Sequence, residues 1–89
     1  MLTTSDHLKI QEVSRKYHIK KVLLFGSNLA PDKENHDIDI AIEGIAPKDF
    51  YSYCGELLMT LSKPVDVIDL SIQSKFTDLI KKEGLPLYG

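Results

Sequence analysis

Apolar residues recur along the chain in periods that predict alternating helices and strands. A first helix is expected over about residues 5–17, because Ile10, Val13 and Tyr17 share one helical face. Its start can be capped by any of three neighbours: Thr4, Ser5 or Asp6. The apolar run over 22–25 then stops at Gly26 and predicts a short buried strand, and the polar, turn-rich segment 28–36 predicts a loop.

The segment 37–43 alternates strictly between polar and apolar residues, which is the pattern of a half-buried strand. Three isoleucines face one side: Ile38, Ile40 and Ile42. The opposite side carries Asp37, Asp39, Ala41 and Glu43. This strand therefore predicts a core on its isoleucine face and two adjacent carboxylates on the other face.

The second half of the chain predicts a helix, a strand and a final helix. Residues 47–62 place apolar side chains at helical spacing after Pro47, and residues 65–70 form an apolar run with two aspartates. The last helix is expected to begin at Ser71 as its N-cap and to end at Gly84 and Pro86. Its apolar face is predicted to consist of Ile72, Phe76, Leu79 and Ile80.

This order predicts an α+β fold, α-β-β-α-β-α, with a small mixed sheet of about three strands and the helices on one face. Three helices and three strands leave too little chain to cover the other face, which is expected to carry the aspartates. With 89 residues the chain supports one thin core, so residues 1–89 are expected to form a single domain.

Composition narrows the class of protein. Cys54 is the only cysteine, so no intramolecular disulfide can form and a reducing cytoplasm is the expected compartment. The net charge of -2 argues against a broad electrostatic grip on nucleic acid. No apolar run approaches the ~20 residues of a membrane span, so no membrane association is expected.

The chemistry-bearing residues lie at strand ends and on the polar strand face. Asp37 and Asp39 would project side by side and repel each other, a penalty that a hard cation such as Mg²⁺ removes. A solvated strand face with two charges is the alternative. Gly26-Ser27 directly follows a strand, where glycine permits close approach of a phosphate and the serine hydroxyl can bond it; a plain turn has the same pattern.

The third strand supplies one more candidate. If Val65 and Val67 face the helices, Asp66 lies on the face that carries Asp37 and Asp39. Asp69 then has the opposite parity and is expected to end the strand or to cap the next helix.

Together these features resemble the nucleotidyltransferase superfamily that includes the DNA polymerase beta palm, and in length and order its minimal nucleotidyltransferase (MNT) branch. The matching segments are "VLLFGS", "HDIDIAIEG" and "KPVDVIDL", and the terminal "KKEGLPLYG" is similar to the usual close of that domain. The resemblance implies that Gly26 and Ser27 hold the nucleotide's triphosphate. It implies that Asp37, Asp39 and Asp66 are the catalytic and metal-binding carboxylates.

The resemblance also implies an activity and a partner. The expected reaction is Mg²⁺-dependent transfer of a nucleoside monophosphate, AMP from ATP, onto a hydroxyl. Members of the MNT branch are often antitoxins encoded beside a helical HEPN-type toxin, and some modify a tyrosine of that toxin. The alternative is a binding module that neutralises a helical partner by contact, with transfer lost. Many MNT proteins carry a basic residue directly after Gly-Ser. This position is Asn28 here, and the missing basic residue favours the second hypothesis, whereas the intact aspartates favour the first.

Overall fold

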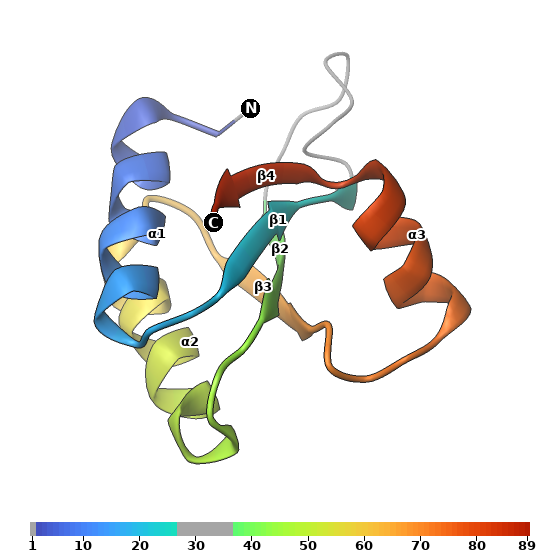
Figure 1. Cartoon of the computed structure of the whole chain (residues 1–89). Helices are drawn as coiled ribbons and strands as arrows, with labels where there is room; N and C mark the ends of the chain where they lie inside the picture. Colours follow the sequence, from blue (N-terminus) through green and yellow to red (C-terminus); the bar gives the residue numbers. More distant parts are fainter. Residues whose placement is uncertain (1, 27–36) are drawn as a thin grey trace.

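The computed structural model describes residues 2–26 and 37–89. The described elements run in the order α1 (Thr4–Lys16), β1 (Lys21–Leu24), β2 (Ile38–Glu43), the short 3-10 helix η2 (Pro47–Asp49), α2 (Phe50–Thr60), β3 (Val65–Asp69), α3 (Lys75–Glu83) and β4 (Leu85–Tyr88). Figure 1 shows the sheet between α1 and α2 on one side and α3 on the other. The predicted α+β class is therefore confirmed.

The sheet is mixed and has the strand order β3-β2-β1-β4. β1 pairs antiparallel with both β2 and β4, whereas β2 and β3 are parallel. The parallel pair follows from the intervening helix α2, since a crossover is needed to return the chain in the same direction. The two strands that carry the aspartates are thus direct neighbours.

The larger core lies between the sheet and the α1–α2 layer. The isoleucines of β2, which are Ile38, Ile40 and Ile42, are at most 1% exposed, as the alternation predicts. They pack with Ile10 of α1 and Leu57 of α2 in one cluster of buried side chains. The apolar side chains that alternate along the strand therefore pack against those that recur at helical spacing in α1 and α2.

The other face of the sheet is not bare, so the expectation of helices on one face only was wrong. A second, smaller core joins Leu23, Ala41, Leu70 and Ile80, with Phe25 and Ile68 packed against it. Ile80 belongs to α3, which covers part of this face. The reason is that Leu23 and Ala41 are apolar on the aspartate side of their strands, and this surface is buried by α3.

The strand count also differs from the prediction, because the chain forms a fourth strand after α3. Gly84 ends the helix as expected, but β4 follows directly and pairs with β1. Pro86 lies in this strand. Proline is tolerated there because β4 is at the edge of the sheet, where a missing donor leaves no ladder bond unmade.

Two helix starts differ from the predicted caps. The N-cap of α1 is Thr3, whose side chain accepts a hydrogen bond from the backbone N–H of Asp6. The N-cap of α3 is Ser74, not Ser71, and it forms a reciprocal capping box with Thr77. Thr77 supplies the third-position partner that this motif requires, which explains why the helix begins three residues later than expected.

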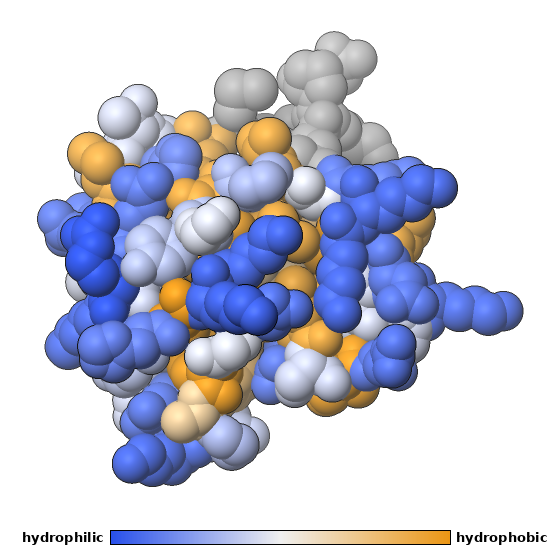
Figure 2. All heavy atoms as spheres, in the orientation of Figure 1, coloured by the Kyte–Doolittle hydropathy of each residue, from blue (hydrophilic) through white to orange (hydrophobic). Residues whose placement is uncertain are grey.

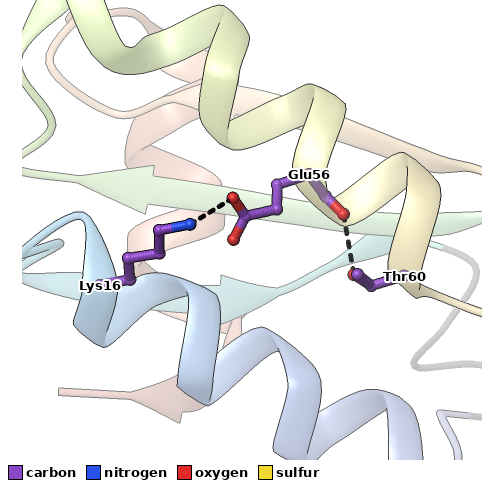
Figure 3. Close-up of polar contacts among 3 residues, drawn as sticks. All are labelled: Lys16, Glu56 and Thr60. Atoms are coloured by element: carbon purple, nitrogen blue, oxygen red, sulfur yellow. Dashed lines mark hydrogen bonds and ion pairs between the residues drawn. The ribbon is translucent and has the colours of Figure 1, made fainter.

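Polar contacts fasten α1 to α2 and to the segment that follows it. Ser14 and Tyr53 share a buried hydrogen bond of 2.9 Å between their hydroxyl oxygens. At the surface, Lys16 Nζ lies 2.7 Å from Glu56 Oε1, and the carbonyl oxygen of Glu56 accepts a hydrogen bond from the Thr60 hydroxyl (Figure 3). The exposed ion pair contributes little to stability, so the buried bond is the stronger link between these helices.

One face of the molecule is mainly polar (Figure 2). In the face shown in Figure 2, hydrophilic side chains cover most of the surface and apolar ones fill the gaps between them. Among the residues that the structure describes, no helix is both long and apolar enough to span a membrane.

Candidate functional site

Three neighbouring side-chain positions form a row across the sheet, where β1 ends and where β2 and β3 begin. Asp39 of β2 is the direct register partner of Asp66 in the parallel strand β3. On the other side, the backbone N–H of Phe25, just after β1, donates a 3.0 Å hydrogen bond to the carbonyl oxygen of Asp39. The two carboxylates and the phenyl ring therefore occupy neighbouring positions, although they are up to about forty residues apart in sequence.

The parity of the third strand is as predicted. Val65 and Val67 pack against the core on the α1–α2 side, so Asp66 points to the opposite face together with Ile68. Asp69 has the other parity, and its carboxylate accepts a 2.9 Å hydrogen bond from the backbone N–H of Ser71. Asp69 thus forms the turn after β3 and does not cap α3, whose N-cap is Ser74.

The pair of carboxylates is electrostatically strained. Burial raises the pKa of the Asp39 carboxyl, and the charges of Asp66 and Asp37 raise it further, as does a hydrogen bond shared with Asp66. All of these effects disfavour a second negative charge beside the first. A cation placed between the carboxylates would reverse this repulsion.

Gly26 brings the backbone close to this carboxylate pair. Its φ of +74° is in the left-handed region, and a Cβ built on it would lie 2.8 Å from the Asp39 Oδ2 atom. A residue with a side chain would be strained in this conformation, and the Asp39 carboxylate would have to shift to make room for it. The geometry next to Asp39 therefore favours the glycine of the predicted phosphate motif, while Ser27 lies outside the described residues.

The donor set fits a hard cation. Asp39 and Asp66 offer carboxylate oxygens from adjacent strands, and Mg²⁺ is commonly bound through one or two carboxylates together with substrate phosphates. Asp37 is exposed and lies one residue before β2. Across residues 2–26 and 37–89, no three histidine, cysteine or acidic side chains form a compact ligand group. The full set of three carboxylates stays a prediction.

Sequence reasoning missed a pocket beside this row. It has a volume of about 370 Å³ and lies between the end of β1 and α3, lined by Phe25, Gly26, Phe76, Leu79, Ile80, Glu83 and Gly84. Phe76 and Leu79 were predicted only as part of the apolar face of the last helix, and both are about half exposed. Their incomplete burial could not be deduced from periodicity, because the position of α3 over the sheet sets it.

Comparison with known proteins finds a family and several solved structures that are similar to this chain. The sequence model of the family "Polymerase beta, Nucleotidyltransferase" matches residues 8–89, which is most of the chain. No curated protein matches the chain.

Solved structures share the fold. A crystal structure of a toxin-antitoxin with AMP-PNP superposes with a TM-score of 0.75 at 24% identity, covering 93% of this chain and 73% of that one. The toxin-antitoxin MntA-HepT gives 0.73 at 22% identity, covering 98% and 73%. A tri-AMPylated Shewanella oneidensis HEPN toxin in complex with MNT antitoxin gives 0.71 at 24% identity, covering 94% and 70%.

Proposed function

Because the chain belongs to the polymerase beta nucleotidyltransferase family, we propose that it transfers a nucleoside monophosphate, AMP from ATP, onto a hydroxyl group with the help of Mg²⁺. The observation that carries this proposal is the direct register of Asp39 with Asp66 beside Gly26. This arrangement provides paired oxygen ligands and a backbone position that a phosphate can approach. We further propose that residues 1–89 act as one domain in the cytoplasm.

The residues have separate roles in the proposed reaction. Gly26 and Ser27 hold the triphosphate, and Asp37 and Asp39 would hold the Mg²⁺ that positions it. A bound Mg²⁺ would neutralise phosphate charge. The acceptor hydroxyl attacks the α-phosphorus in line, the bond between the α-phosphorus and the bridging oxygen breaks, and pyrophosphate leaves. Asp66 lies one strand away from Asp39 and accepts the hydroxyl proton.

The proposed acceptor is a side chain of a HEPN-type toxin, for which this chain would be the antitoxin. Support comes from the similar fold of an MNT antitoxin solved with a tri-AMPylated HEPN toxin. α3 packs over Leu23, Ala41 and Leu70, whereas Asp66 is exposed and Asp39 is only partly buried. A protein side chain can reach the carboxylate row from this exposed side.

A binding module without transfer activity is the second candidate. It is favoured by Asn28 at the position where many MNT proteins carry a basic residue. In this case the protein would neutralise its helical partner by contact alone.

The two candidates are separated by incubating this protein with ATP labelled on the α-phosphate, Mg²⁺ and the product of the neighbouring reading frame, which the proposal expects to be a HEPN-type protein. We predict label on that protein with the wild type, and a loss of at least about a hundredfold with Asp66→Ala, as expected when a general base is removed. Asp69→Ala is the matched control on the same strand and should retain transfer. A stable complex without labelling would establish the binding module, and an inactive Asp69→Ala beside an active Asp66→Ala would contradict the site.

A further inference from the structure

The pocket beside Gly26 combines an aromatic wall with one acidic group. Phe25 and Phe76 meet edge to face, with ring centroids 5.8 Å apart and an interplanar angle of 81°. Leu79 and Ile80 of α3 extend the apolar surface, and Glu83 is the charged side chain of the lining. Its volume of about 370 Å³ is within the roughly 300–1,000 Å³ usual for small-molecule sites.

The pocket adjoins the carboxylate of Asp39, which belongs to the proposed catalytic site. Phe25 is hydrogen-bonded through its backbone to Asp39, and Gly26 belongs both to the pocket lining and to the surroundings of the Asp39 carboxylate. In a nucleotide whose α-phosphate is held at Asp39, only the ribose separates the base from that phosphate. The base must therefore lie near the carboxylate. The pocket is an apolar cavity that shares Gly26 with the surroundings of this carboxylate.

The polar group in the pocket indicates which kind of base fits. A carboxylate accepts hydrogen bonds and cannot donate them when ionised. Glu83 therefore matches an exocyclic amino group, while the phenyl rings offer stacking surface to a planar heterocycle. An aliphatic side chain would fill the apolar part of the pocket but would offer the carboxylate no hydrogen-bond donor of its own.

We propose that this pocket, formed by Phe25, Phe76, Leu79 and Glu83, binds the amino-bearing base of the nucleotide, which is adenine when ATP is the substrate. The inference rests on the proposed nucleotidyl transfer and adds to it the residues that select the base. Phe76 stacks on the ring, and Glu83 accepts from the exocyclic amino group. The phosphates stay with Gly26 and the aspartates.

Binding titrations with the full chain test this assignment, using Mg²⁺ with ATP, with purine riboside triphosphate, which lacks the amino group, and with tripolyphosphate, which lacks the base. Phe76→Ala should weaken ATP binding about tenfold and leave tripolyphosphate unchanged. Glu83→Ala should remove the preference for ATP over purine riboside triphosphate, which in the wild type should be roughly tenfold. Both positions are exposed, so both variants should fold, which their circular dichroism spectra will show.

Two variants on other elements serve as controls: Met59→Ala for the exposed apolar residue and Glu12→Ala for the exposed acid. Both should bind all three probes like the wild type. Unchanged ATP affinity in Phe76→Ala, or wild type that binds tripolyphosphate as tightly as ATP, overturns the base site while the proposed transfer stands. Phe76→Ala that weakens only the complex with the HEPN-type protein also overturns it and assigns the pocket to that partner. A wild type that binds no probe contradicts the proposed function as well.

Discussion

At the scale of single residues, the ionised carboxylate of Asp39 destabilises the folded protein, whereas that of Asp6 stabilises it. Burial and the neighbouring carboxylates raise the pKa of Asp39, so its negative charge is unfavourable in the folded protein without metal or nucleotide. Asp6 is only 1% exposed, but it accepts hydrogen bonds from the backbone N–H and the hydroxyl of Ser62. Burial alone would raise the pKa of Asp6, and these hydrogen bonds outweigh burial and hold the pKa below its usual value.

The residue-scale prediction concerns Asp39→Asn in the absence of metal and nucleotide. The variant should be at least as stable as wild type at neutral pH, because a carboxyl with a raised folded-state pKa destabilises the protein when it is ionised. The advantage of the variant should shrink as the pH falls through the folded pKa of Asp39 towards its unfolded value of about 3.9. Urea unfolding between pH 7 and pH 4 measures this. A clearly less stable Asp39→Asn at pH 7 would mean that the carboxylate has a structural role.

The sequence anticipated Asp39 and Asp66 better than Asp6. Alternation along a strand fixes the face of each side chain, so the parity of Val65 and Val67 was enough to place Asp66. Asp6 was a candidate cap because it precedes an apolar-periodic stretch. Its actual partner, Ser62, lies 56 positions away, and no local pattern encodes such a contact.

At the scale of elements, the contacts of α1 with α2 and the segment after it define one side of the molecule. The buried hydroxyl pair of Ser14 and Tyr53 and the carboxylate of Asp6 fix how α1 lies against that layer. Burial raises the pKa of Tyr53 to about 12, although the hydrogen bond with Ser14 lowers it. Tyr53 is therefore neutral at any physiological pH, and the hydroxyl pair does not respond to pH.

Asp6 should respond to pH, and Asp6→Ala tests its role as a link between elements. The variant loses two hydrogen bonds that Ser62 donates to a carboxylate and should lose about 1–3 kcal/mol of unfolding free energy at pH 7. Because the folded pKa is lowered, this contribution is present above the unfolded value of about 3.9 and is lost as the pH falls through the folded pKa. Chemical denaturation at pH 7 and pH 3 checks both points.

Asp49→Ala is the control for this prediction, since Asp49 precedes α2 without a side-chain cap bond. It should change stability by less than about 0.5 kcal/mol. Equal losses in the two variants, or a loss in Asp6→Ala that does not diminish at pH 3, would show that the contact with Ser62 does not stabilise the fold.

Helices and strands were predictable where the apolar period was long, and less so where it was short. The helix over 47–62 and the strand over 37–43 had many matching positions, and their structures agree with the prediction to within a few residues. β4 has four residues including Pro86, and nothing local distinguishes it from a tail. It is a strand because the edge of β1 offers unpaired backbone groups beside it.

At the scale of the whole molecule, the two faces of the sheet differ in how fully they are packed. The α1–α2 face holds the larger core, and the α3 face holds a smaller core next to the carboxylate row and the pocket. Small size explains this division, since a chain of 89 residues cannot bury both faces fully. The sequence predicted an exposed aspartate face, but the position of α3 depends on packing between residues distant in sequence.

The most direct test of the central claim is to locate a bound cation and nucleotide by NMR, with Mn²⁺ replacing Mg²⁺ and a non-hydrolysable ATP analogue. We predict that nucleotide-dependent paramagnetic broadening is greatest for the backbone amides of Gly26, Asp39 and Asp66, and that it falls off towards Asp69 and the α1–α2 layer. The broadening should be lost in Asp39→Asn. Broadening that centres elsewhere, or that persists unchanged in Asp39→Asn, would contradict the assignment of the carboxylate row as the nucleotide site.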